Sequence, residues 1–99
     1  MNMQQMLMQA QKMQRELKKA QDELKAKEFV ISKGGAVKVT VMGDKSVKAI
    51  DIDKDAFDAD NKEMVEEMIA LAINEAHQAI AKEEEAINEK ITGRPGGLY

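Results

Sequence analysis

The chain of 99 residues contains no cysteine and no tryptophan, only one proline, and 3% aromatic residues. Without cysteine, a disulfide framework and a thiolate metal site are both excluded. No apolar run approaches the roughly 20 residues that a membrane-spanning helix needs, and the first residues lack the basic-then-apolar pattern of a signal peptide. We therefore expect a soluble intracellular protein without a membrane partner, built around one modest core.

Residues that commonly carry catalysis are equally scarce. His77 is the single histidine, and it lies in a helical segment without neighbours that would make it a base or a metal ligand. Ser32 and Ser46 have no histidine at a spacing that suits a nucleophile. The acidic residues between positions 55 and 63 lack the glycine and the distal glutamate of a calcium loop. We expect no enzymatic activity, no metal and no cofactor.

Charge is divided unevenly along the chain, whose formal net charge is −3. Residues 1–50 contain ten lysines and arginines against five acidic residues, whereas residues 51–99 contain five against thirteen. A partner responds to the local field of one surface rather than to the total charge. The basic half of the chain is therefore the place where an anionic partner is expected.

The middle of the chain, residues 28–53, has the pattern of a β-meander. Every second residue from 37 to 41 is valine, the period of two of a strand with one buried face. Glycines on both sides of this run predict turns. The apolar spacing slips by one residue after Val47, which predicts a bulge near Lys48 and Ala49. We predict three antiparallel strands that need a cover on one face.

Residues 1–27 predict a long helix, because they are rich in good helix formers and contain neither glycine nor proline. The apolar residues follow a 3-4 spacing that forms a narrow seam: Met3, Met6, Ala10, Met13, Leu17, Ala20 and Leu24. Such a seam packs on another helix. At about 1.5 Å per residue the helix is roughly 37 Å long, more than a small sheet covers. We expect part of it to project as an arm or to pair with a second helix.

The side of this helix opposite the seam is basic. It carries Lys12, Arg15, Lys18, Lys19 and Lys25. Glu16 and Glu23 lie beside the seam instead, so the two signs of charge are separated. Two interpretations of this face stay open on the pattern alone: a solvated helix surface, or a surface that contacts phosphates.

Residues 54–91 predict a short turn followed by a second long helix. Phe57 is expected to return to the core after the turn. Asp60 is expected to cap the helix, with Glu63 three residues further on, as in a capping box. Beyond the end of the helix, residues 92–99 contain glycines and the proline, which predict a stop and a short tail.

The second helix changes character along its length. Residues 64–76 are apolar almost all round, which indicates burial on more than one side. One chain of this size has too few elements to surround that segment, so we predict a homodimer. The rest of the helix is expected to form a second arm that pairs with the first. The predicted dimer core consists of Val37, Val39, Val41, Ile50, Ile52, Met68, Leu71 and Ala72.

Five segments together resemble a known family. They are residues 9–14 (QAQKMQ), 35–43 (GAVKVTVMG), 50–53 (IDID), 60–64 (DNKEM) and 95–99 (PGGLY). In this order they are similar to the YbaB/EbfC family of bacterial nucleoid-associated proteins, and the similarity extends over essentially the whole chain.

The resemblance implies a single α+β domain over residues 1–99, with α-β-β-β-α protomers that form an intertwined, tweezer-like homodimer. It also implies a cytoplasmic, nucleoid-associated protein that binds double-stranded DNA with little sequence specificity and acts in nucleoid organisation, gene regulation or DNA repair. Recombination or repair proteins are further implied partners. Mapped onto this chain, the DNA-binding residues are Lys12, Arg15, Lys18, Lys19, Lys25, Lys82, Lys90 and Arg94. The glutamates at positions 83–85 and 89 leave the second arm acidic.

A second hypothesis is a protein-binding clamp, as a repair accessory or a chaperone-like module. The order of long helix, hairpins and long helix also occurs in prefoldin-like subunits, and the methionine-rich start of the first helix suits apolar segments of a client. The two hypotheses differ in whether duplex DNA or an unfolded protein competes for the arms.

Overall fold

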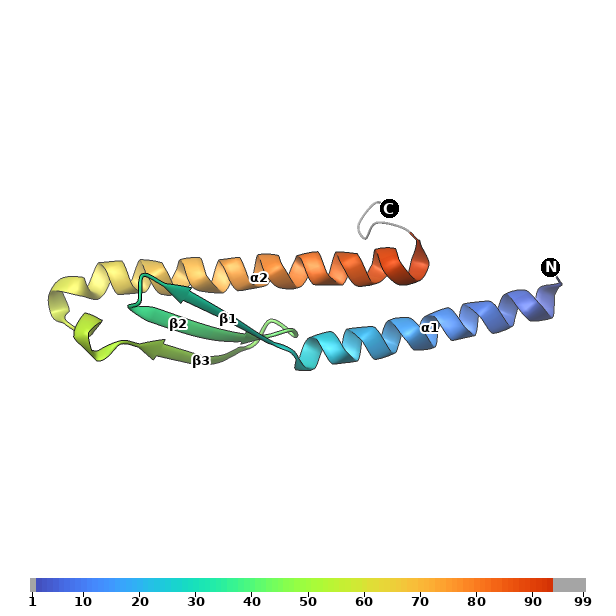
Figure 1. The fold of residues 1–99 in the computed structure, drawn as a ribbon, viewed down its shortest axis with the longest axis horizontal. Helices are drawn as coiled ribbons and strands as arrows, with labels where there is room; N and C mark the ends of the chain where they lie inside the picture. Colours follow the sequence, from blue (N-terminus) through green and yellow to red (C-terminus); the bar gives the residue numbers. More distant parts are fainter. Residues whose placement is uncertain (1, 94–99) are drawn as a thin grey trace.

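The computed structural model describes residues 2–93 (Figure 1). Its elements in chain order are α1 (Met3–Ala26), β1 (Glu28–Lys33), β2 (Val37–Met42), β3 (Val47–Ile52), the 3-10 turns η1 (Lys54–Ala56) and η2 (Ala59–Asn61), and α2 (Lys62–Thr92). The expected α-β-β-β-α order of an α+β protein is confirmed. The molecule is a rod of 69 × 23 × 15 Å, because both helices are much longer than the sheet.

The three strands form an antiparallel meander in the order β1-β2-β3. Val39 at the centre lies opposite Ile31 on one side and Ile50 on the other. Thr40 pairs with Ala49, but the next residue of β2 pairs with Val47, so Lys48 has no partner across the ladder. The predicted bulge is therefore confirmed at Lys48.

The two hairpin turns use different devices. In the first turn Gly34 and Gly35 have φ values of 57° and 68°, a left-handed conformation that glycine adopts without a steric penalty. In the second turn Lys45 has a φ of 79°, and the backbone N–H of Ser46 donates to Asp44 Oδ1 at 2.9 Å. The hydrogen bonds from Ser46 lower the pKa of the Asp44 carboxyl, because they stabilise its charged form.

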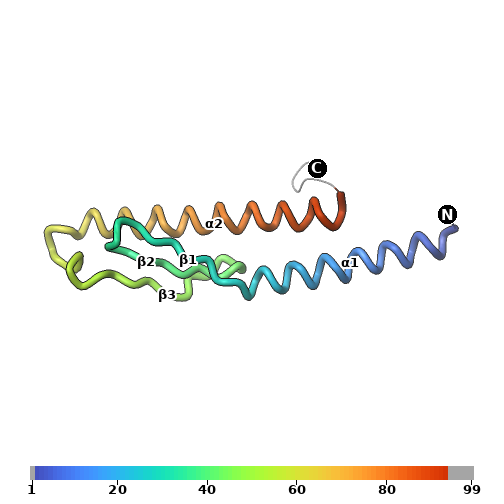
Figure 2. Tube along the Cα trace, in the orientation of Figure 1, coloured from blue at the N-terminus to red at the C-terminus, as the bar shows by residue number. Residues whose placement is uncertain are grey.

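Helix α2 covers one face of the sheet, over β1 and β2, and barely contacts β3 (Figure 2). Its buried residues, Val65, Ala72, Ala76 and Ile80, recur at helical spacing on one stripe. Two of them are alanines, which let the helix axis approach the strands closely. Opposite this stripe β2 presents Val37, Val39 and Val41, of which the last two are fully buried. An apolar core thus exists within one chain.

This packing bears on the residues predicted for the dimer core. Val37, Val39, Val41 and Ala72 are covered by their own chain. Ile52 and Met68 are half-buried at its margin. By contrast, Ile50 is 46% exposed and Leu71 is 52% exposed.

Helix α1, Met3–Ala26, projects from the sheet and is called the arm. Its first turn is capped by Asn2, whose side chain accepts from the backbone N–H of Gln5 at 2.7 Å. Only the last turns contact the rest of the chain: Leu24 is buried, Leu17 and Ala20 are half-buried, and the seam from Met3 to Met13 is exposed. Figure 1 shows the arm extending past the end of α2. The predicted pairing of the two helices is thus confirmed only near the sheet.

The predicted cap of α2 is wrong. Asp60 does not cap the helix, because it lies inside η2, a turn that Asp58 caps by accepting from the N–H of Asp60 at 2.9 Å. The helix continues directly from this turn with Asn61 in the cap position, where the Asn61 side chain makes no capping hydrogen bond. Glu63 therefore lies in the first helical turn without a capping box.

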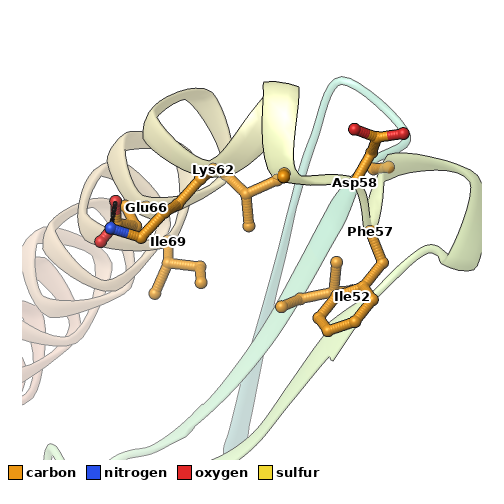
Figure 3. A pocket seen from close by; sticks show the side chains of 9 residues that line it. Ile52, Phe57, Asp58, Lys62, Glu66 and Ile69 are labelled. Atoms are coloured by element: carbon orange, nitrogen blue, oxygen red, sulfur yellow. Dashed lines mark ion pairs between the residues drawn. The ribbon is translucent and has the colours of Figure 1, made fainter.

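The expected return of Phe57 to the core is also wrong, since its side chain is 77% exposed. The Asp53 side chain accepts from the N–H of Asp55 at 2.8 Å and so caps η1. Phe57 directly follows this turn as its C-terminal cap residue, and its backbone N–H donates to the carbonyl of Lys54 at 3.2 Å. The ring lies next to Ile52 at the edge of a pocket rather than under α2 (Figure 3).

The end of α2 is as expected. Gly93 has a φ of 72°, and its N–H donates to the carbonyl of Glu89 at 2.9 Å. This left-handed glycine terminates the helix. The predicted tail, including any docking of Leu98 and Tyr99, lies outside the described residues.

The core makes a first prediction. Replacing Ile80 by alanine leaves a cavity where α2 meets the sheet, because this side chain is fully buried. We expect a loss of about 3 kcal/mol in the free energy of unfolding. Urea unfolding at one fixed chain concentration measures it, with Leu7→Ala on the exposed part of the arm as the control. An Ile80→Ala variant as stable as that control would contradict the packing described.

Candidate nucleic-acid interface

The structure places the predicted cations of α1 on one side of the arm, named here the basic face: Lys12, Arg15, Lys18, Lys19 and Lys25. All five are exposed. Leu24, about half a turn away from Arg15 around the helix, is buried against the body, so the middle of the basic face points away from α2. Lys25 at its end borders a hollow that Gly43 and Glu84 also line. Arg15, Lys18 and Lys19 border one shallow hollow on the helix surface. From Lys12 to Lys25 the face extends about 20 Å along the helix axis.

One cation of the basic face is paired. Lys18 Nζ donates to Asp22 Oδ2 at 2.9 Å, one helical turn further on. This contact lowers the pKa of the Asp22 carboxyl, because the ammonium stabilises the carboxylate. Among residues 2–93 the other four cations of the basic face take part in no ion pair. The charge of Lys25 also acts on the carboxylates of Asp22 and Asp44. The charges of Lys12, Arg15 and Lys19 are therefore the most available to an anionic partner.

The predicted cations of the second helix are in a different environment. Lys82 and Lys90 are exposed near the end of α2, but Glu83, Glu84, Glu85 and Glu89 lie between and beside them. This part of α2 is therefore net negative, as the sequence indicated. Arg94, the last predicted contact, lies outside the described residues.

Two ion pairs join α2 to other parts of the chain, at residues that the sequence patterns did not indicate as functional. Lys27, the residue after α1, contacts Glu83 of α2 at 2.5 Å, and its ammonium lies 5.2 Å from the centre of the Phe29 ring. Lys33 at the end of β1 contacts Glu75 of α2. Both pairs join residues far apart in sequence, so no local pattern reveals them. Exposed pairs of this kind contribute little energy.

The structure also contains an uncovered apolar surface beside β3. Val47 and Ile50 pair with Val41 and Val39, so they lie on the face of the sheet that α2 covers, but they are exposed because α2 does not extend over β3. At one end of α2 a pocket of about 330 Å³ is lined by Ile52, Phe57 and Ile69 (Figure 3). Exposed apolar side chains next to an unpaired edge strand are typical of an interface with another protein chain.

The single histidine of the chain makes a contact within the fold. His77 Nε2 lies 3.2 Å from the carbonyl oxygen of Lys45, so it joins α2 to the second hairpin turn. No group of three or more histidine or acidic side chains within residues 2–93 is arranged to hold a metal ion. Over the same residues, neither helix combines the length and apolar character needed to cross a bilayer.

Comparisons with known proteins agree on one family. A nucleoid-associated protein of Clostridium novyi is 44% identical over 96 residues, which cover 94% of this chain and 82% of the relative. One of Clostridium botulinum is 43% identical over 100 residues, covering 99% and 88%. One of Enterococcus faecalis is 40% identical over 97 residues, covering 96% and 93%. The sequence model of a family described as DNA-binding matches residues 1–95. The chain is a member of the YbaB/EbfC DNA-binding family.

Proposed function

We propose that this protein binds double-stranded DNA as a homodimer, with little sequence specificity, through the basic face of α1. The observation that carries the proposal is the exposed position of these cations on an arm that projects from the body, in a chain of a DNA-binding family. The relatives are named nucleoid-associated proteins, which supports a place on the nucleoid in the cytoplasm. Roles in nucleoid organisation, gene regulation or repair, with repair proteins as partners, are part of the same hypothesis.

The physical basis of binding is the release of counterions from phosphates. Duplex DNA carries about one charge per 1.7 Å of its axis, so a face about 20 Å long meets several phosphates. Lysine and arginine neutralise them and release condensed cations, which makes affinity fall steeply with salt. The basic face contains five cations and no aromatic residue to stack on a base. Phosphate contacts of this kind position a protein without reading sequence.

The acidic part of α2 favours one orientation on DNA. Glu84, Glu85 and Glu89 are repelled by phosphates, whereas Arg15 and Lys19 on the arm are attracted. Among the predicted contacts, we therefore expect those on α1 to dominate and Lys82 and Lys90 to contribute less.

The homodimer is supported by the uncovered apolar surface. A second copy that covers Ile50 and Phe57 removes apolar side chains from water and also satisfies the edge of β3. Dimerisation places two basic faces in one particle. Two arms binding one duplex raise the overall affinity above that of a single arm without any additional type of contact.

The alternative, a protein-binding clamp, is favoured by one observation. The start of the arm exposes Met3, Met6, Leu7 and Met8, flexible apolar side chains of the kind that adapt to different partners. If the arms bind proteins instead, an unfolded client should displace the protein from duplex DNA, or bind where DNA does not.

The basic face makes a second prediction. The double variant Lys12→Glu and Arg15→Glu should weaken binding to a labelled duplex of about 30 base pairs at least tenfold, because it removes phosphate contacts and adds repulsion. Fluorescence anisotropy at several salt concentrations also gives the slope of log affinity against log salt. We expect that slope to become smaller in magnitude by about 2 to 4.

A matched control separates local contacts from net charge. Lys38→Glu with Lys54→Glu changes the net charge equally, but at exposed positions on β2 and η1, outside the arm and outside the pocket beside Phe57. It should change the affinity by less than threefold if binding is local to the basic face. Equal losses in both double variants would contradict the assignment of the site.

The dimer makes a third prediction. Ile50→Asp places a charge on the uncovered surface and should shift the mass measured by light scattering from twice the 11.0 kDa of one chain toward one chain. Val30→Asp is the control, because Val30 is 51% exposed on the opposite face of the sheet. A wild-type protein that is monomeric at tens of micromolar would refute dimerisation, and a dimeric Ile50→Asp variant would exclude this surface.

A further inference from the structure

The place where the arm joins the body is unusually close-packed. Helix α1 ends at Ala26, and the single residue Lys27 connects it to β1. The end of β2 and the turn that follows it lie directly beside this junction (Figure 1). There the backbone N–H of Gly43 donates to the carbonyl oxygen of Lys27 at 2.9 Å. The arm is thus fastened to the sheet through its backbone.

Gly43 is buried at this contact and has no room for a side chain. A Cβ atom at this position would lie 1.7 Å from the carbonyl oxygen of Leu24 and 2.6 Å from its carbonyl carbon. The next nearest atom, the Cα of Lys25, would be at 3.2 Å. All three are backbone atoms of the last turn of α1, so no rotation of a flexible side chain relieves the overlap. The turn itself must move away from the sheet.

The requirement for glycine here is one of space and not of backbone conformation. Gly34, Gly35 and Gly93 have positive φ values, which side chains rarely adopt, but Gly43 does not. A strand-end glycine that contacts another backbone is a known device for close approach. Gly35 provides the contrast, because a Cβ there would meet no atom within 4 Å.

We propose that Gly43 is the positioning residue of the basic face: by admitting the last turn of α1 against the end of β2, it fixes the direction in which the arm leaves the sheet. The arm acts as a lever. At about 1.5 Å per residue, α1 is roughly 36 Å long, so a tilt of about 10° at the junction moves its far end by about 6 Å. The basic face lies along this lever, and its alignment with phosphates therefore depends on a contact that includes no charged side chain.

The inference rests on the proposed function only for its effect on DNA, because the direction of the arm is measurable without DNA. The chain has no native cysteine, so Gln11→Cys and Gln78→Cys provide one spin label on the arm and one on α2. Diluting the labelled chain with excess unlabelled chain ensures that each measured distance comes from one molecule. Pulsed electron paramagnetic resonance then gives the distance between the two labels.

In the Gly43→Ala variant, we expect this distance to shift or broaden by several ångströms and the affinity for a 30-base-pair duplex to fall at least fivefold. Gly35→Ala is the matched control: it lowers stability through its positive φ, but it should leave the distance unchanged and the affinity within twofold. An unmoved arm in Gly43→Ala overturns the proposal. A moved arm with unchanged affinity, in a protein whose wild type binds DNA, overturns it too.

If the wild-type chain does not bind DNA, the proposed function fails, and the distance measurement still tests the role of Gly43. If Gly43→Ala does not fold, amide hydrogen exchange on the wild-type chain decides. The Gly43 amide should then be protected as strongly as the amides of Val39 and Val41, because it is buried and donates to Lys27. Exchange as fast as at the exposed start of the arm overturns the proposal.

Discussion

The structure depends on the packing of one stripe of α2 against two strands of a three-stranded sheet. Ile80, Val39 and Val41 are fully buried in this contact, and the alanines between them allow the helix to lie close to the strands. Helix α2 is longer than any dimension of the sheet, so its packing against the sheet leaves parts of both elements uncovered. β3 and the far part of each helix remain uncovered, and the proposed interfaces lie on these surfaces. The incomplete core and the proposed interfaces are thus two aspects of the same geometry.

The sequence predicted those features that a local period encodes. The alternation in β2, the slip that marks the bulge at Lys48 and the composition of α1 each reflect only nearby residues, and the structure confirms them. The errors have a different origin. Asp60 has the chemistry of a cap, but it lies inside a 3-10 turn that Asp58 caps, and Phe57, which precedes this turn, is exposed. Asp58 and Asp60 have the same intrinsic propensity to cap a helix, so the tertiary fold decides which of them does so.

The candidate site was predictable in part for the same reason. The separation of the basic face from the seam follows from helical period, and the structure leaves all five cations exposed. How much of the seam is paired was not predictable, because it depends on where α2 ends relative to α1. The contact between Leu24 and Gly43 joins α1 to the end of β2 through backbone atoms, so no pattern of side chains predicts it. A glycine at the end of a strand predicts a turn. Only the three-dimensional structure shows that the last turn of α1 occupies the space beside Gly43.

Because only Lys27 connects α1 to β1, the number of residues in α1 determines which side of the arm faces in which direction. No flexible linker separates the helix from β1, so the rotation of the arm about its own axis is transmitted rigidly from the sheet. One residue inserted within α1 between the basic residues and Leu24 would turn the outer part of the helix by about 100° relative to the body, which exchanges the seam and the basic face for other sides. Seven inserted residues restore the orientation to within about 20° and lengthen the arm by about 10 Å. An insertion of whole heptads therefore lengthens the arm and nearly keeps the direction of the basic face, whereas an insertion of one residue changes that direction.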